Sequence, residues 1–240
     1  MKRILFMLTV AMLFSACHYF WGKRVSGDGV IKSMEKSVSA FKEVEVGGAF
    51  KVYVEQGDLK PLTIEGDENL LQYVEVRQEG ETIHINTRQG YNLRPSSDMK
   101  IYLHSPAYSR IDVSGACDII GDSKINNPEN LELSGSGASK ISMDVNAPRI
   151  SAEISGGGTI NLKGQTRAVD LAISGAGDAH CFDLQAESAK ITISGAGSAD
   201  VFASVSLEAD ISGAGNVHYK GGGQIVKQQI SGAGSINKAD

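Results

Sequence analysis

Apolar and polar side chains alternate with a period of two in the second half of the chain. Around each Ser-Gly pair, apolar residues stand one and three places before the serine, as Ile173 and Leu171 do. Others stand five and seven places after it, as Ile160 and Leu162 do. Successive side chains of a strand point to opposite faces, whereas a helix would repeat its apolar positions every three or four residues. The pattern therefore predicts short strands with one buried face.

The Ser-Gly pair itself recurs seven times. Its serines follow one another at intervals of 20, 21, 19, 20, 18 and 19 residues, at Ser114, Ser134, Ser155, Ser174, Ser194, Ser212 and Ser231. A fixed period of this size is typical of a solenoid, in which each repeat forms one coil and packs on its neighbours. We predict an all-β fold, a single-stranded parallel β-helix with about seven regular coils of 18–21 residues.

The glycine after each serine predicts a corner between two strands, because glycine tolerates backbone angles that other residues avoid. Equivalent side chains of successive coils should then stack, with Ile173, Ile193 and Ile211 one above another. The serines should form a hydroxyl ladder. That ladder either satisfies the backbone of the corners, which we favour, or offers a polar stripe to a ligand.

The first half of the chain repeats the pattern less regularly. Residues 44–54 align with the later lines, with Gly47 in the place of the serine and with Val52 and Val54 in apolar positions. Further alternating segments follow as far as residue 103. They predict about two wider, irregular coils before the seven regular ones.

One stretch of the first half, residues 88–98, does not alternate and is expected to be an inserted loop. Its residues Arg88, Tyr91 and Arg94 offer hydrogen bonds and stacking to an acidic or sugar ligand. We take these three residues as a candidate binding loop. The alternative is a surface loop without a partner.

The start of the chain has the pattern of an export signal. A basic beginning precedes an apolar run that is too short to cross a bilayer as a helix. Small residues then lead to Cys17, an arrangement that resembles a lipoprotein cleavage site. We expect residues 1–16 to be a lipoprotein signal peptide, Cys17 to carry the lipid, residues 17–40 to form a tether and a cap, and residues 41–240 to form the β-helix. The alternative is an ordinary secretory signal with an incidental cysteine. The lipoprotein pattern implies the outer membrane, with the periplasmic side favoured over the cell surface.

Charge and cysteine content narrow the function. The chain has 23 Lys and Arg against 28 Asp and Glu, a formal net charge of −5, which argues against nucleic acid as a partner. Cys117 and Cys181 should lie about three coils apart, or ~14 Å, which is too far for a disulfide. We therefore expect two free thiols.

Acidic residues two places before the serine form a candidate polar ladder. Asp112, Glu132 and Glu153 should be neighbours ~4.8 Å apart on adjacent coils. They form either a solvated strip, which we favour, or a cation or acid–base site. Asp118 and Asp178 share another position, but three coils separate them, too far for the paired carboxylates of a glycosidase.

A column of His180, Asp200 and His218 occupies the sixth place after the serine on three adjacent coils. A metal would require the two imidazoles to lean together across ~10 Å, so we expect a solvated column without a metal. The sequence has no phosphate-binding loop and no nucleophile with its base, and we expect no cofactor.

Segments 41–52 (FKEVEVGGAFKV) and 66–71 (GDENLL) and the serial Ser-Gly-Ala-Gly lines together carry a family resemblance. They resemble the head-GIN-domain family of auto-transporter adhesins, which occurs on exported bacterial lipoproteins. The resemblance covers residues 40–240 and implies an all-β solenoid, an exported location and no established enzymatic activity. We therefore expect a lipid-anchored envelope protein with a non-catalytic adhesion role toward a polysaccharide or a protein. Two alternatives stay open: a polysaccharide lyase or hydrolase on the same scaffold, and a scaffold that self-associates as a homo-oligomer.

Overall fold

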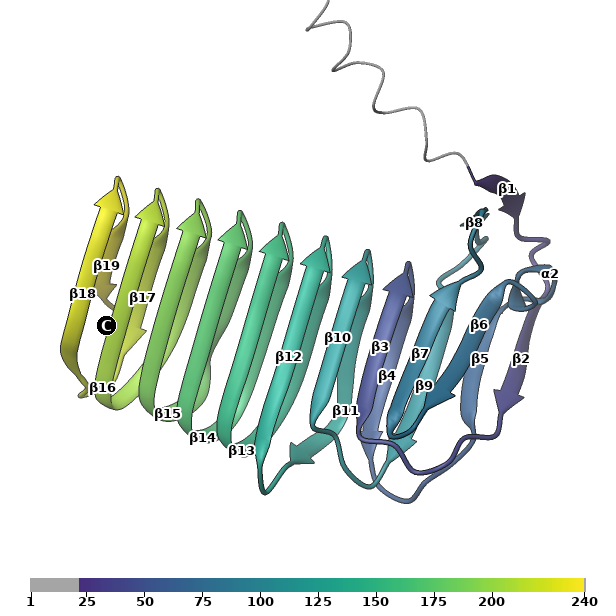
Figure 1. Ribbon diagram of the computed structural model, residues 1–240, viewed down its shortest axis with the longest axis horizontal. Coiled ribbons are helices and arrows are strands. Elements are labelled where there is room, and N and C mark those ends of the chain that lie inside the picture. The colour runs from purple at the N-terminus through teal and green to yellow at the C-terminus, as the bar shows by residue number, and fades with distance from the viewer. Residues whose placement is uncertain (1–21, 240) are drawn as a thin grey trace, which may run out of the picture.

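The computed structural model describes residues 22–239. They form an elongated stack of strands along one long axis (Figure 1). Seventeen strands belong to one continuous sheet that winds around an apolar interior, and two more form a separate pair. Residues 22–239 contain one short helix, α2 (Glu68–Leu71), and none that is long and apolar enough to cross a membrane. The all-β prediction is confirmed.

The seven predicted coils are confirmed between residues 110 and 238. Each coil has one strand that enters a Ser-Gly corner and one that leaves it, and each pairs in parallel with the next coil. The longest strands continue through the bend from one coil into the next. The strands are β10 (Arg110–Gly115), β11 (Asp118–Asn126), β12 (Asn130–Gly137), β13 (Lys140–Gly156), β14 (Thr159–Gly175), β15 (Asp178–Gly195), β16 (Ser198–Gly213), β17 (Asn216–Lys220), β18 (Gln224–Gly232) and β19 (Ser235–Lys238).

Inward side chains stack in columns as the alternation predicts. Ile173 is in register with Ile193, and Ile193 with Ile211. All three are buried to 2% exposure or less. Every inward residue therefore packs against its counterparts above and below, and each coil stabilises its neighbours through the same kind of contact.

The Ser-Gly corners require glycine for two reasons. Gly175 has φ +117°, a left-handed conformation that other residues rarely adopt. A Cβ on Gly175 would also lie 2.6 Å from the carbonyl oxygen of Gly156 in the preceding coil. By contrast, a Cβ on Gly157 would meet no atom within 4 Å. The same glycine position therefore closes the turn and permits the close stacking of coils.

The second repeat is shifted by two residues from its predicted alignment. Ser114 is in register with Ser136, not with Ser134, and the corner glycine of this coil is Gly137. Gly135 takes an inward position, and the space that its missing side chain leaves is filled by Ser139, which is buried. Ser134-Gly135 has the sequence of the corner motif but stands two residues before the corner. The corner itself is formed by Ser136 and Gly137.

The serine ladder follows the corrected register. Ser114 and Ser136 donate hydrogen bonds to carbonyl oxygens of the preceding coil, at 3.5 and 3.4 Å. The later corner serines, Ser155, Ser174, Ser194, Ser212 and Ser231, are exposed.

Two irregular coils precede the regular ones, but their order in space differs from their order in the sequence. They are built from β3 (Glu43–Gly48) with β4 (Lys51–Gln56), and from β7 (Thr82–Thr87) with β9 (Lys100–Ser105). The β3–β4 coil comes first in the sequence, yet it lies between the β7–β9 coil and the first regular coil (Figure 1). After β3–β4, the chain thus forms the β7–β9 coil on the N-terminal side and then returns to the other side of β3–β4 to begin β10.

Antiparallel strands close the N-terminal end of the stack. They are β2 (Ile31–Lys36), β5 (Leu62–Asp67) and β6 (Val74–Glu79). β2 pairs with β5, β5 with β9, and β6 with β7. Beside them, β1 (Lys23–Ser26) and β8 (Tyr91–Arg94) form the separate parallel pair. At this end, the single-stranded parallel helix gives way to a mixed sheet.

A buried carboxylate connects the segments of this cap. Asp67, at the end of β5, is fully buried and accepts hydrogen bonds from the backbone N–H groups of Gly29 (2.8 Å) and Ser96 (2.9 Å) and from the Ser96 hydroxyl (2.6 Å). The hydroxyl bond from Ser96 contributes most to holding the pKa of Asp67 below its ordinary value, and burial opposes it. Through these three hydrogen bonds, the Asp67 carboxylate connects the segments around Gly29 and Ser96 to the end of β5.

The two described cysteines are free, as predicted, and both are buried. Burial raises the pKa of the Cys181 thiol to about 12 and also raises the pKa of Cys117. Both behave as small core residues with little thiolate character. The predicted signal peptide and Cys17 lie outside the described residues.

Candidate ligand-binding groove

The predicted acidic ladder is not continuous. Because the second repeat is shifted by two residues, Glu132 is in register with Arg110 and Ser151. Ser134 stands between Asp112 and Glu153 instead. The expectation that the three acids occupy adjacent rungs of one column is therefore wrong.

The acidic neighbour of Asp112 is Glu45 of β3, which belongs to the irregular β3–β4 coil. Each of these carboxylates has its own cationic or polar partner. An Arg110 Nη2 lies 3.1 Å from Asp112, and the Nδ1 of His84 lies 2.9 Å from Glu45. The pair is thus part of an exposed charge network with matched partners.

The stretch that contains Arg88, Tyr91 and Arg94 is not the predicted irregular loop, because residues 91–94 form β8 and pair with β1. The Arg88 Nε lies 3.1 Å from Glu75, and the Tyr91 ring packs at 4.5 Å from the ring of Tyr73. The Arg94 carbonyl accepts a hydrogen bond from the Gly27 N–H at 2.9 Å. Internal contacts therefore occupy much of this candidate loop.

In the column of His180, Asp200 and His218, the side chains also bond to one another. Each imidazole places its Nδ1 on a different oxygen of Asp200, at 2.9 Å for His180 and 3.1 Å for His218. Within residues 22–239, no group of three His, Cys, Asp or Glu side chains is arranged to hold a metal ion. The carboxylate bridges two histidines across three coils.

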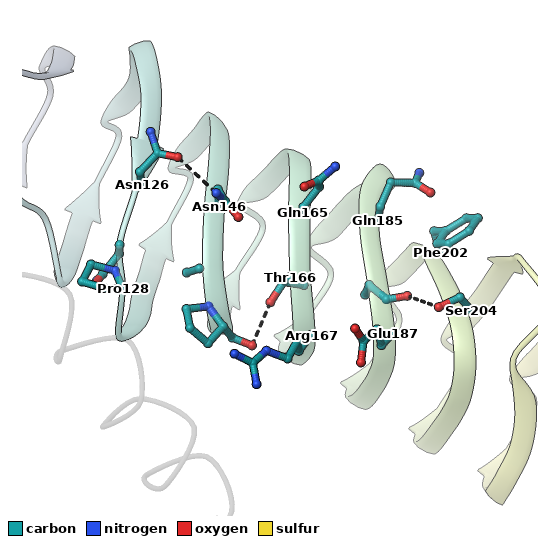
Figure 2. A pocket seen from close by; sticks show the side chains of 14 residues that line it. Asn126, Pro128, Asn146, Gln165, Thr166, Arg167, Gln185, Glu187, Phe202 and Ser204 are labelled. Carbon is teal, nitrogen blue, oxygen red and sulfur yellow. Dashed lines mark hydrogen bonds between the residues drawn. The ribbon is translucent and has the colours of Figure 1, made fainter.

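A different surface gathers polar side chains that have few internal partners. It lies midway along the chain between successive corners, and so at the opposite edge of the solenoid. There, four amide side chains are in register on four successive coils: Asn126, Asn146, Gln165 and Gln185. The next coil continues the row with Phe202. We call these five residues the amide row; they line a groove of about 790 Å³ (Figure 2).

The amide row contains both fixed and free groups. The Nδ2 of Asn146 donates to the Oδ1 of Asn126 at 3.2 Å, which orients these two side chains. Gln165 and Gln185 are exposed, and their amides have no hydrogen-bond partner among residues 22–239. Each free amide presents a donor and an acceptor side by side.

Beside the amide row, the hydroxyl groups that line the groove are already hydrogen-bonded to backbone carbonyls. Thr166 donates to the carbonyl oxygens of Pro148 (3.3 Å) and Ala168 (2.9 Å), and Ser204 donates to Ala186 (3.3 Å). Arg167 and Glu187 are the only charged residues of the lining, and their charges cancel. The groove is therefore polar with zero formal charge.

The C-terminal end of the row is aromatic. Phe202 is half-buried, and a Cβ on Gly221 would lie 3.3 Å from its ring. Lys220 is in register with Phe202, and its Nζ lies 5.0 Å from the ring centre of Phe182. The last free amide, on Gln185, is thus followed along the row by Phe202 and then by Lys220.

Sequence reasoning misses the amide row because its spacing from the corner varies. The four amides and the phenylalanine follow their corner serines by 12, 10, 10, 11 and 8 residues. Bulges between the coils absorb these differences, for instance between Asn161 and Gly164 and between Cys181 and Gln185. The recurrence of one amide per coil between successive corners was the available signal.

Fold and groove together define a capped parallel β-solenoid with a polar surface groove. A family model with the description "putative auto-transporter adhesin, head GIN domain" matches residues 40–223. The chain belongs to this family, as the resemblance predicted. The match ends before β18, so the last coil lies beyond it.

Solved structures support the fold. The chain is similar to a putative adhesin from Bacteroides fragilis NCTC 9343, with 21% identity and a TM-score of 0.83 over 90% of this chain and all of the other. It is also similar to two proteins of Parabacteroides distasonis ATCC 8503. One is a putative lipid binding protein, with 28% identity and a TM-score of 0.70 over 91% of this chain and all of the other. The second is a putative adhesin, with 25% identity and a TM-score of 0.70 over 90% and all, respectively. None of the curated proteins compared with the chain matches it.

Proposed function

We propose that this protein is a non-catalytic adhesin of the bacterial cell envelope that binds polysaccharide through the groove along its amide row. The adhesin description of its family supports a binding role. The observation that carries the proposal is the row of two exposed, unpartnered amides, Gln165 and Gln185, that continues into the ring of Phe202 on the next coil. Ligand sites combine apolar surface with a few well-placed polar groups in this way.

The separation of the two aspartates that stand four places after a corner serine supports a non-catalytic role. Asp118 stands in register with Lys51 and Lys140, and Asp178 is three coils away, or ~14 Å. Glycosidases need two carboxylates within ~5–9.5 Å. Asp178 accepts a hydrogen bond from the hydroxyl of Ser198 on the next coil.

The proposed location is the outer membrane, with the lipid on Cys17 as anchor and the periplasmic side favoured. A family of exported adhesins is consistent with this location. Radiolabelled palmitate should enter the wild-type protein and not a Cys17→Ala variant, which should move to the soluble fraction. Equal membrane retention of both proteins would contradict the lipid anchor.

Binding and turnover should be measured together on one panel of neutral and acidic polysaccharides. We expect retention on an array of some polysaccharides without release of reducing ends or unsaturated products. Turnover that disappears in an Asp178→Asn or Glu132→Gln variant would overturn the non-catalytic proposal. Absence of binding to every polysaccharide would overturn the ligand class.

A further inference from the structure

We propose that the groove takes a neutral, hydroxyl-rich polysaccharide whose chain runs along the solenoid axis, from Asn126 toward Phe202. This inference rests on the proposed function and adds to it a direction, a ligand charge and a set of contact residues.

The direction follows from the register of the amide row. Each coil contributes one member of the row, and successive coils are ~4.8 Å apart, so the five residues span ~19 Å along the axis. Across the axis, each coil contributes only two or three neighbouring residues to the groove, such as Gln165 to Arg167. A chain that lies along the axis meets one polar group after another, whereas a chain across it would meet one or two.

The chemistry of the free groups points to hydroxyls. A carboxamide is both donor and acceptor, so it can bind two neighbouring hydroxyls at once or bridge one hydroxyl and a ring oxygen. Gln165 and Gln185 have no internal partner among the described residues, and Asn146 keeps its Oδ1 available after its bond to Asn126. The fixed asparagines begin the row, and the free glutamines provide the adaptable contacts.

The aromatic end of the groove favours sugars among hydroxyl-rich ligands. The ring of Phe202 is half-buried by its coil and carries no polar atom, so its exposed part can only offer apolar contact. A pyranose has an apolar face of C–H groups and a polar rim of hydroxyls. The ring of Phe202 suits the face, and the amide of Gln185 in the adjacent coil suits the rim.

The charge of the groove favours a neutral ligand. Arg167 and Glu187 belong to adjacent coils, and they are the only ionised residues among the residues that line it. Among the lining residues, an acidic polysaccharide would gain from the arginine what it loses to the glutamate, so the lining gives it no net attraction; Lys220 lies outside the lining, one coil beyond Phe202. Binding should therefore change little with ionic strength.

The test is calorimetric titration of the full-length protein with defined oligosaccharides. The probes are neutral gluco-, xylo- and manno-oligosaccharides of two to six units, and oligogalacturonates as the acidic set. We expect a neutral series to bind, with affinity rising with length and then levelling once the ~19 Å row is filled. Changing the salt from 50 to 500 mM should alter the affinity less than about twofold.

Three variants and one matched control assign the contacts. Gln165→Ala and Gln185→Ala should each weaken binding about fivefold, and Phe202→Ala about tenfold. Gln229→Ala is the control, because this glutamine is also exposed, on β18, and has no hydrogen-bond partner within the described residues, yet lies on another face. The control should bind as the wild type does. All four residues lie at least partly on the surface, and circular dichroism should show unchanged folding.

The possible failures are distinguishable. Neutral-glycan binding that survives all three substitutions would overturn the assignment of the groove and leave the adhesin role intact. Stronger, salt-sensitive binding of oligogalacturonate would overturn the neutral class. No glycan binding, together with saturable binding of an envelope protein, would overturn the proposed function itself.

Discussion

The two ends of the solenoid are built on opposite plans. The N-terminal end is closed by the antiparallel strands β2, β5 and β6 and the helix α2, and its apolar residues are buried beneath them. At the C-terminal end, β18 pairs only with β16 among the described strands, and all nine of its residues are exposed. The same stacked column that buries Ile193 to 1% exposure leaves Ile230 at 36%. Burial in this fold therefore comes from neighbouring coils and not from the coil itself.

The open end also carries polar residues in inward positions. Gln228 is in register with the buried Ala209, and Lys238 is in register with Tyr219. Val226 is the extra residue of a bulge in β18. Inward polar groups and bulges are the features by which sheet edges avoid pairing with other chains. One end is covered by added structure, and the other is protected by its side chains.

The largest expected effect on stability comes from the same Ile→Ala substitution made once in an interior coil and once in the end coil. Ile193→Ala removes side-chain volume from a full column and should lower the free energy of unfolding by about 4 kcal/mol. Ile230→Ala acts on the exposed end of that column and should lower it by about 1 kcal/mol. Urea unfolding followed by circular dichroism measures both values. Equal losses would mean that burial does not depend on position along the stack.

The next prediction concerns the cap. Asp67→Ala leaves the N–H of Gly29 and both donors of Ser96 without their acceptor and should cost about 3 kcal/mol. The pKa of Asp67 is lowered in the folded protein, so its stabilisation is complete above the ordinary aspartate value of 3.8 and is lost as the pH falls through the lower folded pKa.

Unfolding experiments as a function of pH test this assignment. Below pH 3.8 the difference in stability between the wild type and Asp67→Ala should shrink. Asp28→Ala is the control, since Asp28 is exposed nearby and bonds only the N–H of Val30 through its side chain. A difference that stays constant down to low pH would show that the charge of Asp67 is not what stabilises the cap.

The corners supply a third comparison, between two glycines of adjacent coils. Gly175→Ala forces a left-handed backbone and a close contact with the Gly156 carbonyl, and it should cost about 2 kcal/mol. Gly157→Ala adds a methyl group in open space, at a position where other corners already have alanine. It should change stability by less than about 0.5 kcal/mol. Similar costs at both positions would contradict the stacking account of the corner.

The smallest effect is expected at the open edge. Gln228→Ile replaces an inward polar residue of the last coil with an apolar one and should leave folding intact while promoting association of β18 edges. Light scattering on the purified protein should detect a rise in mass with concentration that exceeds that of the wild type. Gln229→Ile, which faces outward in the same strand, is the control. An identical rise in both variants would point to general stickiness rather than to the edge.

The sequence by itself determined the regular coils. Alternation with a period of two and a corner glycine every coil are local properties, and each coil repeats the local preferences of the last, so Ile173, Ile193 and Ile211 had to stack once one coil did. The tertiary structure decided whatever depends on choosing between partners far apart in the chain. It placed the β3–β4 coil between the β7–β9 coil and the first regular coil, and it aligned Ser136 instead of Ser134 with Ser114, with Ser139 in the space beside Gly135. It also aligned amides at unequal spacings into one row, because bulges adjust the length of each bend while the backbone hydrogen bonds between coils hold the register.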